Sequence, residues 1–525
     1  MEEMTIKLNA PGMTSLHKAG LAGLYMTLRA FEEKGETIKG LNWELEPTQV
    51  KLIWLDDKPK SAFEELVAKS FWLDDGFIRL AGLEINEAPT PDRKHQLNYA
   101  LQNSFLQFGP ENPTGKPRPL FYEVDDRLCG TKDFKPILKI RHEKAPQDFV
   151  ELDGHFKHQV MTKSWMYPGG ITRHSYAKHD KATTIFEPLQ SAVALLFAPV
   201  GVIYYLIRSR TKGRKARAAM LVPDVKDLAA YILVKQAIAS RGVLDLTASS
   251  ASDAVLRLLI TIKAKDASNQ FAEIAKDSFL CRVSTFGIVN WNEKQKTRTY
   301  TQTVFSGRLE GLENYYLADT IFKNRWQVSK QDKSRKGQQE SYFVLNPTAR
   351  EFIADNIAQG RTWYYDLATF LSNKEARKGL SYERKELNNM VEKASFKNDN
   401  ERLFISVCHE SWRKRMGKLS DQARTGGGYR RERIQKEFER LRTSLLRSRN
   451  AHSLRQTIVD LWARAGMNED LQGEGLHKLL PLFDEQHWRK TRDLALLALI
   501  SYQPKDPDEA AVLTAEMTEE GEETK

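Results

Sequence analysis

Four histidines and a neighbouring aspartate are the residues of this chain whose types could support metal chemistry. His155 and His158 are three residues apart, and His174 and His179 follow, with Asp180 directly after. Neutral imidazole nitrogens bind zinc, and a carboxylate beside them suits the metal of a nuclease. No cysteine or glutamate joins them at ligand spacing, and scattered histidines in a basic protein more often contact phosphate or face solvent. Two interpretations stay open: a metal-dependent nucleic-acid-processing enzyme, and histidines that hold no metal.

The chain lacks the short motifs of nucleotide hydrolysis and of common hydrolases. It contains no G-x-x-x-x-G-K-[ST], no G-x-G-x-x-G after a strand, no H-E-x-x-H and no G-x-S-x-G. Its three cysteines, Cys129, Cys281 and Cys408, are far apart and form no C-x-x-C pair, which argues against a disulfide framework and a thiolate zinc finger. The first residues show no signal peptide. We therefore expect a cytoplasmic protein that is neither an ATP-driven helicase nor an ordinary esterase.

An apolar segment followed by a dense run of cations is the most distinctive stretch of the chain. Ser191 to Ile207 carries no charge, and Ala218 to Val222 is apolar again. Between them lie Arg208, Arg210, Lys212, Arg214, Lys215 and Arg217. The Val, Ile, Tyr and Leu content of the first segment predicts one or two buried strands, with Ala198 to Gly201 as the break between them. A rigid scaffold that holds a cationic loop suits the binding of a polyanion.

A membrane span is an alternative interpretation of this stretch, since cytoplasmic cations often flank such spans. The uncharged run is at the short limit for a span, which needs about 20 apolar residues. It also contains Pro199 and Gly201 near its middle. For the cations themselves, a solvated loop or a localisation signal is the alternative. We favour buried segments that flank a cationic loop, and no contact with a membrane.

Length and charge set the expected domain organisation and the kind of partner. A chain of 525 residues should hold two to four domains, and a net charge of +11 favours an acidic partner, most often nucleic acid. We expect an α/β module over 1–110, a central α+β region with basic loops over 111–373, a basic helical bundle over 374–505 and an acidic, disordered tail over 506–525. The fold class is therefore α+β, followed by an all-α C-terminal bundle.

The helical bundle carries a strongly basic segment. From Arg413 to Arg449, cations outnumber acids about three to one, so pairs four residues apart cannot neutralise them. A solvated helix face is the commonest fate of such charges, but a bound polyanion would relieve their repulsion. Gly426 to Gly428 separates two helices within the segment. We expect nucleic-acid contacts from Arg413, Lys414, Arg415, Arg424, Arg430, Arg431 and Arg433.

Three further segments carry side chains that suit recognition of nucleic acid. One is the Pro/Gly-rich loop over 109–120, another is the Pro-Gly-Gly turn over 168–170 with aromatic residues before it, and the third is a strand end near residue 290. They contribute Lys116, Arg118, Arg173, His174, Asn290, Trp291 and Asn292. Aromatic rings can stack on bases, and amides can read base edges. Ordinary turns whose aromatic rings fill the core are the alternative.

The order of these parts resembles the large subunit of a type I CRISPR surveillance complex (Cascade), of the I-B/I-A group that also occurs beside Tn7-like transposons. The similarity is carried by SLHKAGLAGLYMTL at 15–28, MYPGG at 166–170 with Arg173-His174, LLFAPVGVIYY at 195–205, LVPDV at 221–225 and the basic bundle. It covers most of the chain through diffuse segments.

The resemblance implies a protein that is not an enzyme and that reads DNA, with no catalytic residue, metal or cofactor. Such a subunit recognises the protospacer-adjacent motif, promotes R-loop formation and holds the displaced strand. The implied partners are a guide RNA, target double-stranded DNA and its displaced strand, the backbone, handle-end and guide-processing subunits, small subunits, and a helicase-nuclease or transposition targeting proteins.

The C-terminal bundle resembles the small subunit of such complexes, which related systems also produce from an internal start. Met390 is the candidate start here, with Met416 the runner-up.

Overall fold

The structure is a computed structural model in which two compact units are distinguished. It describes residues 2–56, 58–85, 88–106, 112–162, 166–168, 185–208, 216–239, 241–266, 280–290, 295–305, 311–328, 341–426, 430–466, 471 and 474–504. The N-terminal unit comprises Met1–Arg208, Lys215–Arg308 and Asn324–Leu345. The C-terminal unit comprises Ser209–Arg214, Leu309–Lys323 and Asn346–Lys525. The expected fold class, α+β followed by a helical region, is confirmed; the finer division into domains stays a prediction.

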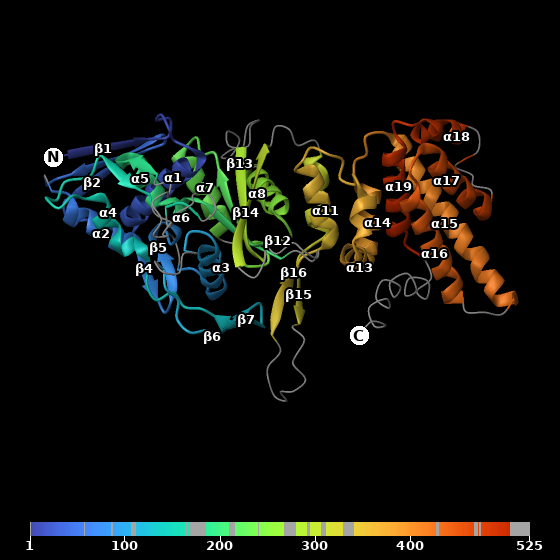
Figure 1. Ribbon diagram of the computed structural model, residues 1–525, viewed down its shortest axis with the longest axis horizontal. Coiled ribbons are helices and arrows are strands. Elements are labelled where there is room, and N and C mark those ends of the chain that lie inside the picture. The colour runs from blue at the N-terminus through green and yellow to red at the C-terminus, as the bar shows by residue number, and fades with distance from the viewer. Residues whose placement is uncertain are drawn as a thin grey trace. The chain divides into compact units, whose positions relative to one another are not determined.

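The N-terminal unit begins with a three-stranded antiparallel sheet of order β1-β3-β2 (Figure 1). Its strands are β1 (Glu2–Lys7), β2 (Leu41–Glu46) and β3 (Gln49–Trp54). The alternation of polar and apolar residues places Met4 opposite Leu52 and Ile6 opposite Val50, with all four side chains buried. This apolar face packs towards helix α1 (Ser15–Lys34).

Helix α1 is the centre of the unit. Thr14 is its N-cap, and Gly35 ends it in the left-handed conformation at φ 65°. A Cβ on Gly20 would lie 2.1 Å from the carbonyl oxygen of Ala194, and a Cβ on Gly201 would lie 1.6 Å from that of Ala19. The glycines therefore let the backbones of α1 and of the 189–201 segment come into direct contact.

That segment corrects the strands expected over Ser191 to Ile207. It forms two short helices, α5 (Leu189–Leu196) and α6 (Ala198–Gly201), and only Ile203–Ile207 is a strand, β10. Helix α5 is buried on nearly all sides, and a fully buried helix has the same continuous apolar composition as a buried strand. Within the described part of the chain, no helix has both the length and the apolar character needed to cross a bilayer.

A five-stranded sheet of order β12-β10-β11-β13-β14 forms the middle of the N-terminal unit (Figure 1). The further strands are β11 (Ala216–Pro223), β12 (Thr247–Ala248), β13 (Leu280–Asn290) and β14 (Gln295–Phe305). All neighbours are antiparallel except β12, which runs parallel to β10. Helix α8 (Ala251–Asp266) packs on β11 and β13, and helix α3 (Pro91–Asn103) packs on β10 and β11.

Smaller elements complete the unit. A mixed sheet of order β15-β16-β7-β6 is joined by a parallel pair, Tyr342 opposite Cys129. Its strands are β6 (Arg118–Val124), β7 (Arg127–Phe134), β15 (Arg325–Val328) and β16 (Tyr342–Leu345). Two short antiparallel pairs are β4 (Phe71–Asp74) with β5 (Phe77–Leu80), and β8 (Gln159–Met161) with β9 (Phe186–Pro188). The remaining longer helices are α2 (Lys60–Ser70), α4 (Ala145–Phe149) and α7 (Leu228–Ala239).

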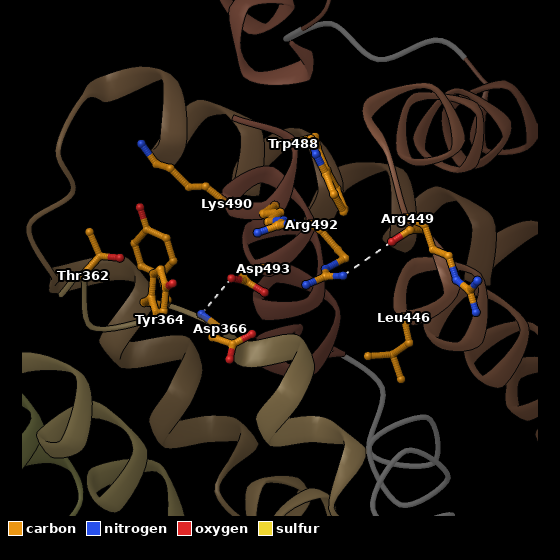
Figure 2. Close-up of a pocket in the computed structure, with 12 residues that line it drawn as sticks. Thr362, Tyr364, Asp366, Leu446, Arg449, Trp488, Lys490, Arg492 and Asp493 are labelled. Atoms are coloured by element: carbon orange, nitrogen blue, oxygen red, sulfur yellow. Dashed lines mark hydrogen bonds between the residues drawn. The ribbon is translucent and has the colours of Figure 1, made fainter. Parts of the chain in front are cut away.

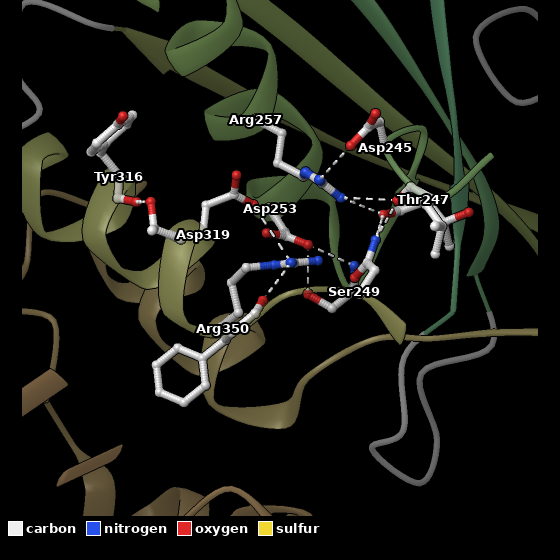
Figure 3. A network of polar contacts seen from close by, with 12 residues as sticks. Asp245, Thr247, Ser249, Asp253, Arg257, Tyr316, Asp319 and Arg350 are labelled. Atoms are coloured by element: carbon white, nitrogen blue, oxygen red, sulfur yellow. Dashed lines mark hydrogen bonds and ion pairs between the residues drawn. The ribbon is translucent and has the colours of Figure 1, made fainter. Parts of the chain in front are cut away.

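The described residues of the C-terminal unit form helices and loops (Figure 1). The helices are α10 (Leu312–Ile321), α11 (Thr348–Ile357), α12 (Leu367–Ser372), α13 (Lys374–Tyr382), α14 (Arg384–Lys393), α15 (Asp399–Gly426), α16 (Arg430–Arg447), α17 (Ala451–Ala465), α18 (Glu474–Leu479) and α19 (Trp488–Ser501). Helix α19 packs against α12, α14, α15, α16 and α17, so it is the core helix. The fully buried Arg350 of α11 ties α10 to α11 by donating to the carbonyl of Phe322 at 2.8 Å and pairing with Asp319 at 3.5 Å (Figure 3).

Candidate nucleic-acid interface

The five-stranded sheet brings two of the expected binding segments to the same end. Strand β10 leads into the cationic connector, which we define as residues 208–217, and β11 leads out of it, with Leu206 opposite Ala218. Ala216 at the start of β11 is opposite Gly287 of β13, and β13 continues in that direction to Asn290. Antiparallel pairing therefore places the connector's ends beside the end of β13 at Asn290, and Trp291 and Asn292 follow that residue in the sequence.

The base of the connector is anchored by a polar network in the N-terminal unit (Figure 3). The backbone N–H of Arg208 donates to the carbonyl of Ala248 in β12 at 3.0 Å. Buried Arg257 of α8 holds β12 by donating to the carbonyl of Thr247 at 2.9 Å, and it pairs with Asp245 at 3.6 Å. Asp253 of α8 accepts from Ser249 N at 2.8 Å. The connector thus begins at a firmly held point.

The side chain of Arg208 lies in a recess lined by aromatic residues, which we call the Arg208 recess. Its Cζ is 5.9 Å from the ring centroid of Phe343 in β16. The guanidinium also interacts electrostatically with Tyr99 of α3, Tyr122 of β6 and Cys129 of β7. Burial lowers the pKa of Arg208, although the residue keeps an exposed surface. A cation that is partly withdrawn from water interacts more strongly with an incoming anion.

His95 joins the Arg208 recess through Tyr122. The Nδ1 of His95 is 2.8 Å from the Tyr122 hydroxyl. Burial, and secondarily the charge of Arg208, lowers the pKa of His95 to about 4. The histidine is therefore neutral at physiological pH, and the recess holds one cation among half-buried aromatic rings. Such an arrangement can stack a base and bind its phosphate.

Lys116 lies on the loop before β6, and Arg118 is the first residue of that strand. The two side chains differ in their surroundings. Lys116 is exposed. Arg118 is 45% exposed in its side chain, yet its Nη2 donates to Asp75 Oδ1 at 2.7 Å and its Cζ lies 5.7 Å from the ring of Phe134. Arg118 is thus held against the surface by its own neighbours.

The turn expected to present aromatic rings is described only in part. Met166 is fully buried, and the half-buried Tyr167 donates its hydroxyl to Glu187 of β9 at 2.6 Å. Glu187 also pairs with His17 of α1 at 3.4 Å. Tyr167 therefore serves packing and anchoring here.

Several expected residues cannot be placed. Outside the described residues lie Arg173, His174, Arg210, Lys212, Arg214, Lys215, Trp291 and Asn292. For four further residues the structure describes the strand or helix but not the side chain: Arg217, Asn290, Arg424 and Arg431.

Ion pairs neutralise much of the basic helical segment. Arg413 and Lys414 both pair with Glu410, which precedes the segment counted in the sequence. Pairs with Glu432, Glu437 and Glu439 occupy Lys436, Arg440 and Arg442 respectively. Arg415 pairs with Glu437 across two helices, and Arg430 donates to Ser420 at 2.9 Å. Arg433 is half-buried. The basic segment therefore has fewer unpaired cations than the numbers of cations and acids between residues 413 and 449 indicate.

The histidines proposed as metal ligands are only partly described. His155 and His158 are exposed, and His174, His179 and Asp180 lie outside the described residues. In the described part of the chain, no group of three or more His, Cys, Asp or Glu side chains could hold a metal ion.

One cationic cluster was not selected from the sequence. Trp488, Arg489, Lys490 and Arg492 open α19 and line a cavity of the C-terminal unit. In the sequence, this cluster is marked only by an aromatic residue and three cations within a stretch of five residues. The other walls come from segments that are distant in the sequence, so the cavity itself could not be inferred from that signal.

Comparison with known proteins shows what the chain resembles. The DevT N-terminal domain model matches residues 5–196, and the DevT C-terminal domain model matches residues 392–525. The chain is therefore similar to DevT proteins at both of its ends. The chain is also similar to the CRISPR-associated protein Cas8a1/Csx13 of Myxococcus xanthus (strain DK1622), with 28% identity over 543 residues that span 97% of this chain and 91% of the relative. The resemblance to CRISPR large subunits is thereby confirmed; the association with Tn7-like transposons stays a prediction.

Proposed function

We propose that this chain is the non-catalytic large subunit of a type I CRISPR surveillance complex. In that complex it recognises the protospacer-adjacent motif of duplex DNA, promotes R-loop formation and holds the displaced strand. Its partners are the guide RNA, the target DNA and the other subunits of the complex. Similarity to a CRISPR-associated relative along 97% of the chain supports the assignment to such a complex.

The observation that carries the DNA-reading role is the shared end of the five-stranded sheet. There the ends of the cationic connector lie beside the end of β13 at Asn290, and the connector starts from the Arg208 recess. In RNA-guided recognition, base pairing reads the sequence, and the protein reads only a short duplex motif and holds backbones. Cations and amide side chains gathered at one sheet end suit both tasks.

We assign motif reading to Lys116, Arg118, Arg173, His174 and the turn over 290–292. The connector and the basic helices would hold nucleic-acid backbones. Among these candidates, Lys116 is exposed, whereas Arg118 is already engaged by Asp75, so Lys116 is the better probe of the loop.

The proposal is tested in the guide-loaded complex with target DNA. The test variant replaces Arg210, Lys212, Arg214 and Lys215 with serine. The control replaces Lys7, Lys34, Lys39 and Lys58 with serine; these are exposed lysines of the N-terminal unit, for which the described residues provide no ion pair. Affinity is measured with and without the protospacer-adjacent motif over a range of salt concentrations.

We expect the connector variant to bind target DNA at least about tenfold more weakly, with a salt slope reduced by about 0.9 for each lost phosphate contact. The control should stay within about twofold of the unmodified complex. Equal losses in both variants would show that overall charge, and not the connector, governs binding. A chain that co-purifies with no guide RNA would remove the basis of the proposal.

A further inference from the structure

A cavity of about 470 Å³ in the C-terminal unit has the composition of a ligand site (Figure 2). We call it the α19 recess. Its walls are the 362–366 loop between α11 and α12, the 446–449 segment at the end of α16, and the first residues of α19. The volume lies within the range of about 300–1,000 Å³ that is usual for small-molecule sites.

Three arginines of the α19 recess lack a carboxylate partner among the described residues. Arg449 and Arg489 are exposed, and their side chains form no ion pair with the described residues. Arg492 is half-buried; its Nη1 donates to the Ser448 carbonyl at 3.4 Å, and its Nε is buried without a hydrogen-bond partner there. A buried donor without a partner is costly, so an incoming acceptor would be stabilised.

The acids near the recess are already occupied, and the Oδ1 of Asp366 in its wall accepts from the Thr369 hydroxyl at 2.8 Å. Lys490 pairs with fully buried Glu401, which also accepts from the Tyr364 hydroxyl at 2.5 Å. The Asp493 carboxylate accepts from the backbone N–H groups of Asp366 at 2.8 Å and Ala368 at 3.1 Å. Burial raises the pKa of Asp493 to about 7, so this group carries only part of a negative charge at neutral pH. The recess is therefore net cationic.

The recess also has an aromatic wall. Tyr365 is 47% exposed, and the guanidinium of Arg361 lies over its ring at 4.8 Å. Arg489 and Arg492 each lie within 5.5 Å of the ring of Trp488, which holds their guanidinium groups at the recess. Planar guanidinium groups bind phosphate oxygens in pairs, and an exposed aromatic ring stacks on a base.

We propose that the α19 recess binds one nucleotide unit, with its phosphate on Arg449, Arg489 and Arg492 and its base against Tyr365. The inference deepens the proposed function, because a single strand held by the complex would supply that nucleotide. A free nucleotide has the same chemistry, and the experiment below distinguishes the two sources.

The test uses the full chain and three probes: a short single-stranded oligothymidylate, adenosine 5′-monophosphate and inorganic phosphate. The test variant combines Arg449→Gln with Arg489→Gln, because both residues are exposed and the fold should tolerate the change. The matched control combines Arg464→Gln with Lys478→Gln, which removes the same charge from exposed cations outside the basic segment that are already paired with Asp460 and Glu474. Tyr365→Ala and Tyr365→Phe test stacking, with Tyr382→Ala as the control for an exposed tyrosine.

We expect the Arg449/Arg489 variant to bind the oligothymidylate at least about tenfold more weakly, with a salt slope lower by about 0.7 per phosphate contact. The control should change affinity less than about twofold. Tyr365→Phe should bind normally, and Tyr365→Ala should lose about fivefold or more, since base stacking contributes about 1–3 kcal/mol. Tighter binding of the oligonucleotide than of the monophosphate identifies a strand as the source, and equal binding identifies a free nucleotide.

Three results would overturn the proposal. They are equal losses in the test and control variants, inorganic phosphate binding as tightly as the nucleotide probes, and equal competition by an acidic peptide. A photocrosslink from 4-thiothymidine in the oligonucleotide to the peptide that contains Tyr365 is a second readout that does not depend on the fold of a variant. Failure of the proposed function is separate: the connector variant would then keep target binding, whatever the α19 recess does.

Discussion

Arg415 of α15 donates its Nε to Glu437 Oε1 of α16 at 2.9 Å, which joins two helices of the C-terminal unit. The Arg415 side chain is only 14% exposed. Although burial acts to raise the pKa of Glu437, hydrogen bonds from Arg440 and Arg415 hold that pKa below its usual value. A cation expected to contact nucleic acid therefore stabilises the fold.

Arg415→Ala should lower the free energy of unfolding of the full chain by about 1–3 kcal/mol, because Glu437 loses one of its charged partners. Arg413→Ala removes an exposed cation from the same helix and should change stability by less than about 0.5 kcal/mol. Chemical denaturation followed by circular dichroism measures both. Equal effects would contradict a structural role for Arg415.

Gly20→Ala should be strongly destabilising, because its Cβ would meet the Ala194 carbonyl oxygen at 2.1 Å. Neither backbone can yield easily, so we expect a loss of about 3 kcal/mol or more, or failure to fold. Gly417→Ala is the matched change in another helix interior, where a Cβ has nothing within 4 Å. It should stabilise the protein by about 0.5–1 kcal/mol. Similar thermal stabilities of the two variants would refute the close contact.

Asp493 should make stability fall as pH rises from about 4 to about 7. Burial raises its pKa to about 7 in the folded protein, whereas an unfolded aspartate titrates near 4. The folded state thus binds more protons in this window, and stability decreases until the pH exceeds the folded pKa. Asp493→Asn removes the titration and should reduce the stability difference between about pH 5 and about pH 8 by up to about 3 kcal/mol.

Chemical denaturation at the two pH values measures this difference. Glu485→Gln, on the exposed loop before α19, is the control and should leave the pH dependence unchanged. An unchanged pH dependence in Asp493→Asn would mean that its carboxyl group is not titrated in this range.

Met390→Leu tests the internal start proposed for a separate small subunit. Met390 is fully buried in α14, and leucine has a similar volume, so the full chain should lose less than about 1.5 kcal/mol of stability. If translation starts there, intact mass spectrometry of the natural gene's products should lose the short fragment in this variant only. Met416→Leu, also buried, is the parallel change at the second candidate. Persistence of the fragment in Met390→Leu would exclude that start.

Local features of this chain were predictable from the sequence, and tertiary ones were not. Thr14 and Gly35 mark the ends of α1 because capping depends on neighbouring residues. The β10–β11 pair around the connector follows from two apolar runs with a polar break. The helical state of 189–201 did not follow, since burial on all sides removes the periodicity that separates helix from strand.

The candidate binding residues also divide into local features, which were predictable, and tertiary contacts, which were not. The sequence identifies cations but not their partners, and Arg415 finds Glu437 from 22 residues away. The α19 recess needs three segments, at 362–366, 446–449 and 488–493, that only the fold brings together. Counting acids within one segment therefore overestimates how much positive charge the surface offers.

The backbone contact between α1 and the 189–201 segment also has a consequence for biosynthesis. Gly201 can reach Ala19 and Gly23 of α1 only after the ribosome has released the chain past residue 201. At about 5–20 residues per second, the apolar faces of α1 then wait on the order of ten seconds or more for their partner. During this interval the nascent chain exposes the apolar, aggregation-prone surface of α1. Slower synthesis or fewer chaperones should therefore lower the yield of folded protein.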